Sequence, residues 1–151
     1  MAAVPSGERE AGGMAVAVKM FSKLIVNDEE AMAAYYCAVY GLNAVHREAG
    51  DSVGTGESFR EVILSPGTAM EGGSLVMFKF VDRPAPRDQQ SILGFVTDDL
   101  DGIVTRIGLH GGKLVGPTRE MPKFGIRVQF AEDPEGALNE IVEMTAPSAV
   151  A

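Results

Sequence analysis

Several short, largely apolar stretches recur in the N-terminal half of the chain. The first covers residues 20–26, where both sides of an extended backbone carry largely apolar side chains. This pattern predicts a β-strand that is covered on both faces. Further short apolar runs predict strands at about residues 44–48, 58–64 and 74–80. Segments rich in Gly and Pro separate them, as expected for turns.

A helix is predicted between the first two strands. Through residues 28–40 the apolar side chains recur at three- and four-residue spacing, which places them on one face of a helix. Asn27 is the expected N-cap, because Glu30 follows three residues later as in a capping box. Gly41 suits the left-handed conformation that often ends a helix. Residues 19–82 therefore read as one βαβββ module.

The same order of elements returns after a Pro-rich link. Val96 and its two successors correspond to Val26 and its two successors at an offset of 70 residues, which indicates an internal repeat. We expect the second helix to be capped by Asp98 or Thr97. The elements predicted for the second module, residues 90–145, are a strand at 91–97, a helix at 99–110, a short strand at 113–115 and hairpin strands at about 126–131 and 138–144.

The final hairpin carries the main candidate for chemistry. Its turn is Asp133-Pro134-Glu135-Gly136, and Glu140 follows in the second strand. A two-residue period places Glu140 on the same side as Leu138 and Val142. Such a carboxylate lies either in a functional cavity or on a solvated sheet edge, and the sequence leaves both open.

The hairpin also carries a resemblance. The run R-V-Q-F-A-E-D-P-E-G-A-L-N-E-I-V resembles the closing segment of the vicinal oxygen chelate superfamily, which includes glyoxalases, bleomycin resistance proteins and ring-cleaving dioxygenases. In that superfamily the second module ends in D-P-[DE]-G-x-x-x-E-[LI]. The resemblance implies an α+β fold of two tandem βαβββ modules, a pair of half-barrels that encloses a cavity for a small molecule and often a divalent metal.

The metal ligands implied by the resemblance are mostly missing. In metal-dependent members four positions on the first and last strand of each module carry His, Gln or Glu, a set suited to Mn, Fe, Ni or Zn. Here Glu140 matches the fourth position, whereas Phe21 and Ile92 stand at the first and third. The second position falls within residues 75–78, which are all apolar. We therefore expect no metal centre and no cofactor.

The expected ligand site follows from strand alternation and the resemblance. Glu140 is the candidate catalytic residue, either as a proton acceptor or, if Lys23 or Arg127 pairs with it, as a fixed anion. Lys23 is expected to face the same cavity, although a long amine at a strand end can equally reach solvent. The residues expected to bind the ligand are Phe21, Lys23, Met77, Ile92, Gln129 and Glu140.

Other reactive side chains are interpreted as structural. His46 falls on a predicted strand and His110 at a helix end, without partners at the spacing of a metal site. Cys37 falls within the first helix without a neighbouring base, so it is expected to be a small packed residue.

Composition narrows the possible partners. The chain has 151 residues, 46% of them hydrophobic, and a formal charge of −8. This charge disfavours nucleic acid, which requires clustered basic residues, and no apolar run of about 20 residues could span a membrane. A single cysteine and the lack of a signal peptide point to the cytoplasm. Residues 1–18 and 146–151 are expected to be flexible tails.

Two functional classes remain. The first is a metal-free binding protein of the bleomycin-resistance type, which sequesters a largely apolar organic ligand. The second is an enzyme, either a metal-independent isomerase, lyase or cyclase with Glu140 as base, or a metal-dependent lyase or dioxygenase with unrecognised ligands. The resemblance further implies a homodimer with two symmetric cavities. The identity of the ligand is beyond the sequence.

Overall fold

The computed structural model describes residues 17, 20–70, 73–88 and 90–145, so the predicted tails lie almost entirely outside the described residues. The described chain forms eight strands, two α-helices and one 3-10 helix. In chain order they are β1 (Ser22–Ile25), α1 (Glu29–Tyr40), β2 (Asn43–Asp51), β3 (Ser58–Ser65), β4 (Leu75–Phe80), β5 (Leu93–Thr97), α2 (Leu100–Leu109), β6 (Lys113–Met121), η1 (Pro122–Phe124), β7 (Ile126–Glu132) and β8 (Leu138–Met144).

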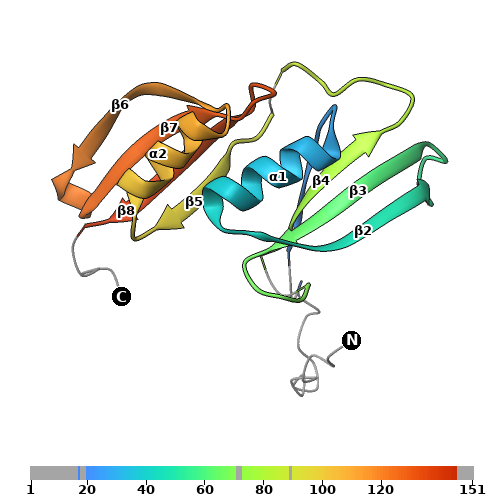
Figure 1. Cartoon of the computed structure of the whole chain (residues 1–151), viewed down its shortest axis with the longest axis horizontal. Helices are drawn as coiled ribbons and strands as arrows, with labels where there is room; N and C mark the ends of the chain where they lie inside the picture. The colour runs from blue at the N-terminus through green and yellow to red at the C-terminus, as the bar shows by residue number, and fades with distance from the viewer. Residues whose placement is uncertain (1–16, 18–19, 71–72, 89, 146–151) are drawn as a thin grey trace.

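The strands form two four-stranded sheets with the same topology. Their orders are β1-β4-β3-β2 and β5-β8-β7-β6, with β1 parallel to β4, β5 parallel to β8, and the remaining pairs antiparallel. The two sheets lie side by side, both helices cover the same side of them, and neither sheet closes into a barrel (Figure 1). The predicted α+β fold of two tandem βαβββ modules is confirmed.

Both helices start one residue later than predicted. The N-cap of α1 is Asp28, whose side chain accepts a hydrogen bond from the Ala31 backbone N–H at 2.9 Å. The N-cap of α2 is Asp99, which accepts from Gly102 at 3.0 Å. Asn27 instead accepts from the Ala85 backbone N–H, a long-range contact. The caps therefore repeat at 71 residues and not at 70.

Two strands are longer than predicted. The second strand extends to Asp51, and β6 continues past an irregularity between Val115 and Arg119 to end at Met121. The additional residues are exposed, so they show no apolar alternation. These residues belong to the strands because their backbones pair with the neighbouring strand. Such pairing does not require a particular kind of side chain.

One core serves both modules. On α1 the buried residues include Met32, Tyr36 and Val39, and they belong to the same cluster as Met77 of the first sheet and Ile141 of the second. Residues of β3, β4, β7 and β8 alternate between this helix-covered side and the opposite side of each sheet. The first helix lies between the two sheets in Figure 1, consistent with its contribution to the packing of both.

Polar and aromatic contacts fix the modules against each other. The Tyr36 hydroxyl donates to Asp133 at 2.7 Å and accepts from the Asn139 amide at 3.1 Å. The Tyr40 ring stacks on Phe95 with centroids 3.7 Å apart. These contacts all lie on the helix-covered side of the second sheet. We call the opposite faces of the two sheets the open faces.

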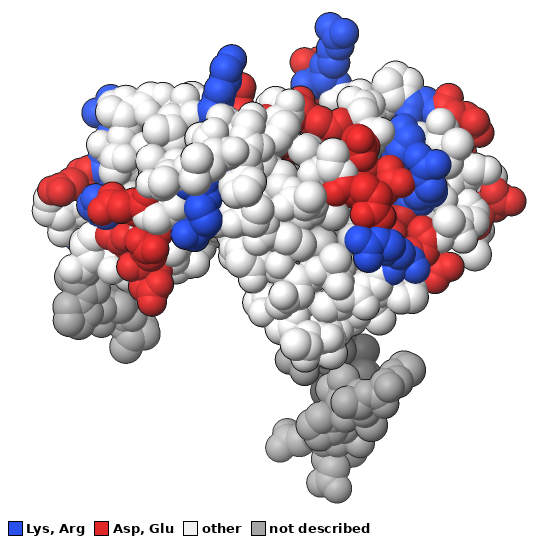
Figure 2. All heavy atoms as spheres, in the orientation of Figure 1, with Lys and Arg blue, Asp and Glu red and all other residues white. Residues whose placement is uncertain are grey.

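The helix-covered side of the molecule has an uneven charge distribution. Acidic and basic side chains gather over the first sheet and the N-terminal end of α1, whereas a broad area between the modules is uncharged (Figure 2). Two ion pairs join α1 to the first sheet, Glu30 with Arg47 at 2.6 Å and Glu29 with Arg60 at 2.7 Å. In the part of the chain that is described, no helix is long and apolar enough to cross a membrane.

Candidate functional site

The open face of the second sheet holds Glu140 among apolar neighbours. In the strand register Glu140 lies between Phe130 of β7 and Gly94 of β5. Leu138 and Val142 flank it along β8 on the same face, as the alternation predicted. A Cβ atom added to Gly94 would meet no heavy atom within 4 Å, so open space lies directly beside the carboxylate-bearing strand.

The two basic residues considered as partners of Glu140 are engaged elsewhere. Arg127 lies on the helix-covered side, 2.9 Å from Glu143 and 3.3 Å from Asp101. Lys23 pairs with Glu61 on the first sheet at 2.7 Å. No ion pair to Glu140 is formed by any residue in the described ranges. Its half-buried carboxylate thus has no basic partner among these residues.

Lys23 belongs to a polar pair on the open face of the first sheet. Its amine lies 4.7 Å from the centre of the Phe78 ring while it donates to Glu61. The Glu61 side chain is only 10% exposed. Lys23 is therefore held over the sheet by two contacts and does not extend freely from the strand end.

An aromatic cluster adjoins this polar pair. Phe59 and Phe78 are stacked with centroids 5.2 Å apart and planes at 14°, and Phe80 stands at 76° to Phe78 with centroids 4.8 Å apart. The Arg83 guanidinium lies 3.5 Å from the Phe80 ring centre. In the register Phe59 faces Phe80 and Glu61 faces Phe78, so all four share the open face. The sequence analysis did not single out these residues, because strand alternation alone does not tell which residues of different strands become neighbours.

The two histidines occupy different settings. On β2 His46 lies on the open face, with Nε2 3.0 Å from the Glu48 carboxylate, and this hydrogen bond lowers the pKa of Glu48. His110 is the C-cap residue of α2, as expected for a residue that ends the helix. Burial raises the pKa of the Cys37 thiol, which disfavours a reactive thiolate.

The predicted ligand-binding residues do not all share the open faces. Phe21 and Ile92 precede β1 and β5 by one residue and are 65% and 52% exposed. Met77 is fully buried in the core on the helix-covered side. Gln129 is also buried there, where its amide donates to the carbonyl oxygens of Gly116 and Phe130 at 2.9 and 2.8 Å. Met77 and Gln129 thus lie on the other face from Glu140, contrary to expectation.

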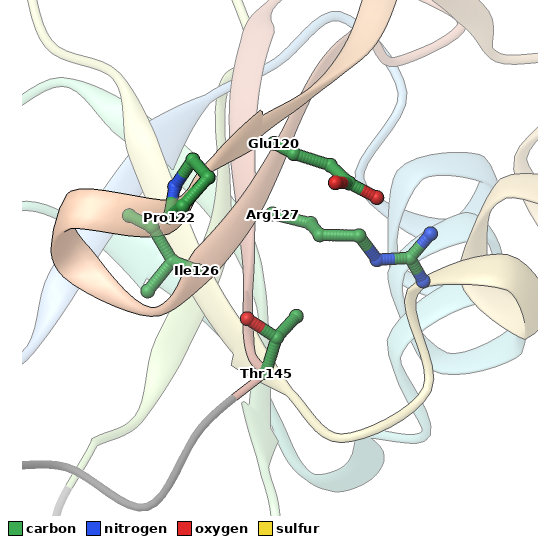
Figure 3. Close-up of a pocket in the computed structure, with 5 residues that line it drawn as sticks. All are labelled: Glu120, Pro122, Ile126, Arg127 and Thr145. Carbon is green, nitrogen blue, oxygen red and sulfur yellow. The ribbon is translucent and has the colours of Figure 1, made fainter.

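A small hollow lies at the end of the second sheet. It has a volume of about 150 Å³ and is lined by Glu120, Pro122, Ile126, Arg127 and Thr145. Glu120 and Arg127 extend side by side along one wall (Figure 3). The guanidinium of Arg127 is already paired with two carboxylates, and Glu143 in turn accepts from the Leu100 backbone N–H at 2.7 Å. The contacts of Arg127 and Glu143 therefore hold the start of α2 in place. Glu140 is not one of the residues that line the hollow.

Comparison with known proteins decides the family. Residues 16–141 match the family model of the Glyoxalase/Bleomycin resistance protein/Dioxygenase superfamily. The chain belongs to this superfamily. No curated protein sequence is similar enough to match the chain.

Several solved structures share the fold. A glyoxalase family protein from Bacillus cereus has a TM-score of 0.72 at 17% identity, with 90% of this chain and 100% of that chain covered. TioX from Micromonospora sp. ML1 has a TM-score of 0.60 at 20% identity, with 85% and 99% covered. Glyoxalase I from Zea mays has a TM-score of 0.64 at 17% identity, and 84% of this chain matches 47% of the maize chain.

The residues present do not fit the metal centre of the superfamily. Of the four ligand positions only Glu140 offers a donor atom, since Phe21 and Ile92 are apolar and the open face of β4 presents Val76 and Phe78. Among the described residues, no three His, Cys, Asp or Glu side chains are placed to hold a metal ion. One carboxylate is too few ligands to retain a transition metal against water.

Proposed function

We propose that this superfamily member binds a small, largely apolar organic molecule against the open sheet faces without a metal, and sequesters it. The observation that carries the proposal is Glu140, a half-buried acid without an ion pair among the described residues, flanked by Leu138 and Val142 and by the space beside Gly94. Apolar surface with a few convergent polar groups is the usual composition of a small-molecule site.

A second copy of the chain is proposed to complete the site. The open faces end at the edge strands β1 and β5, where Phe21, Ile92 and Val96 are 65%, 52% and 76% exposed. Large apolar side chains exposed at the edges of sheets are typical of surfaces that become covered. In a two-fold homodimer the open face of one protomer would lie opposite that of its partner and form two equivalent cavities.

The role of Glu140 can be tested by substitution. A thermal-shift screen of organic compounds against the wild-type protein provides a ligand, and Glu140→Gln keeps the side-chain shape while it removes the charge. Loss of a charge-assisted hydrogen bond should lower affinity at least tenfold, about 1.4 kcal/mol, with little change in the stability of the free protein.

Glu120→Gln provides the matched control. This acid lies in the hollow of Figure 3 and should leave affinity unchanged. A loss of affinity in Glu120→Gln together with normal binding in Glu140→Gln would move the site to the hollow and refute the proposal.

The alternative is an enzyme of the superfamily that uses Glu140 as a general base. The carboxylate without an ion pair also favours this function, because a neighbouring cation would make it a weaker proton acceptor. Mass spectrometry of each ligand after prolonged incubation with the protein separates the two. Intact ligand supports a binding protein, and a product that Glu140→Gln fails to form supports the enzyme.

We also propose the cytoplasm as the site of action. The single cysteine agrees with a reducing compartment, where disulfides are not needed. Fractionation of the native cells with an antibody against the chain tests this assignment.

A further inference from the structure

The hollow at the end of the second sheet contains an acid that lacks a counter-charge. Glu120 of β6 lies directly opposite Arg127 of β7 in the strand register, and both side chains extend along one wall of the hollow (Figure 3). Opposite charges at such positions usually stabilise a sheet by pairing. Glu120 and Arg127 form no ion pair, and no other residue in the described part of the chain pairs with Glu120.

Arg127 is held by two other carboxylates. Its Nε and Nη2 atoms lie 3.0 and 2.9 Å from Glu143, and Nη2 also donates to Asp101 at 3.3 Å. The Glu143 side chain is only 14% exposed and accepts a further hydrogen bond from the Leu100 backbone N–H. These contacts fix the guanidinium toward α2. Since three carboxylates share one guanidinium, the electrostatic potential in the hollow favours a positively charged occupant.

The size and the walls of the hollow limit the rest of the occupant. Its volume of about 150 Å³ corresponds to roughly five water molecules at about 30 Å³ each. Pro122 and Ile126 are apolar, and the aliphatic stems of Glu120 and Arg127 add hydrocarbon to the same walls. A short hydrocarbon chain with one cationic end therefore suits both the volume and the lining.

We propose that the hollow is a binding site for a small primary alkylamine in its ammonium form, with the nitrogen at the Glu120 carboxylate and the chain against Pro122 and Ile126. An ammonium group supplies both the missing counter-charge and charge-assisted hydrogen bonds. A neutral alcohol leaves Glu120 without a counter-charge, and an anion is repelled. The site is separate from the open faces, because Glu140 does not line it, so the inference does not rest on the proposed function.

Four small probes test the ligand class by NMR titration of the isotope-labelled full chain at neutral pH and low salt. They are n-butylamine, methylamine, n-butanol and butyrate. We expect n-butylamine to bind about threefold or more tightly than n-butanol, the gain of a partly solvated ion pair, and butyrate to bind more weakly still. Methylamine should bind at least about fivefold more weakly than n-butylamine, because it lacks the chain that contacts the walls.

Two outcomes of this titration would overturn the inference. Equal affinities for n-butylamine and n-butanol would show that the hollow does not select a cation. Equal affinities for methylamine and n-butylamine would show that the apolar walls are not used.

Substitution of the acid locates the amine. Glu120→Gln keeps the shape of the side chain but removes its charge, and should make n-butylamine bind no more tightly than n-butanol. The matched control is Glu132→Gln on β7, an acid that does not line the hollow and should leave the affinity unchanged. The backbone amides that shift most should be those of Ile126, Arg127 and Thr145. Shifts centred elsewhere, or the same affinity in Glu120→Gln, would contradict the assignment.

A further probe tests whether the amine belongs to a protein. Nα-acetyl-lysine N-methylamide carries the same aminobutyl group on a peptide backbone. Tighter binding of this probe than of n-butylamine would assign the hollow to a lysine side chain of a protein partner, and the free amine would be wrong. Weaker binding supports the free amine. The proposed function is tested at Glu140 with an organic ligand and this inference at Glu120 with an amine, so either can fail while the other stands.

Discussion

Two adjacent tyrosines on α1 differ in what their hydroxyl groups contact. The Tyr36 hydroxyl is fully buried and bonded to both Asp133 and Asn139. The Tyr35 hydroxyl is buried without a hydrogen-bond partner among the described residues, and burial raises the pKa of Tyr35 to about 12. The Tyr36 hydroxyl is thus hydrogen-bonded, whereas the hydroxyl of the preceding Tyr35 has no hydrogen-bond partner among the described residues.

This difference predicts opposite effects on stability. Tyr36→Phe should lower the free energy of unfolding by about 1–3 kcal/mol, because it leaves the buried Asp133 and Asn139 groups short of a partner. Tyr35→Phe should change it little or raise it by up to about 1 kcal/mol, since it removes an unsatisfied buried hydroxyl. Urea denaturation of both variants at neutral pH provides the measurement. An equal loss in the two would contradict the hydrogen-bond assignment.

At the scale of the element, each helix starts from an aspartate that accepts a backbone N–H. Asp99 is the cap of α2, and its neighbour Asp98 is exposed. Asp99→Ala should therefore cost about 1 kcal/mol of stability, whereas Asp98→Ala should stay within about 0.5 kcal/mol of the wild type. Thermal unfolding of the two variants compares them directly. A larger loss of stability in Asp98→Ala than in Asp99→Ala would indicate that Asp98, one of the two caps predicted from the sequence, caps the helix.

The elements show where sequence reasoning succeeds and where it stops. The helices were predicted to within a residue or two, because the 3.6-residue period is a local property of the chain. The outer half of β6 was missed because both of its sides are exposed, and only its pairing with β7 defines it as a strand. Topology followed from the repeat together with the family resemblance.

The candidate site was predictable only where alternation is unambiguous. Glu140 alternates with buried residues, so its side of β8 could be read from the sequence. Met77 lies in an unbroken apolar run, Leu75 to Phe78, in which either side could face the core. Gln129 is buried by contacts with Thr118 and Gly116, which lie within the irregular segment between Val115 and Arg119 that no local pattern reveals.

At the scale of the whole molecule, the modules join through their helix-covered sides and leave both open faces available. Because the edge strands expose Phe21, Ile92 and Val96, we predict a homodimer in sedimentation velocity at micromolar concentration. Val96→Asp would place a charge on this edge and should shift the protein toward monomer without unfolding it. Sedimentation of the wild type at monomer mass would count against the dimer.

The opposite sides of β8 also affect how this protein can change during evolution. Asn139 and Ile141 hold the modules together, whereas Glu140 and Val142 face outward. Substitutions at the outward positions change the proposed binding face, while the inward positions continue to maintain the fold. Single substitutions can therefore change this face without unfolding the protein, and a library varied at the outward positions alone should consist mostly of folded proteins.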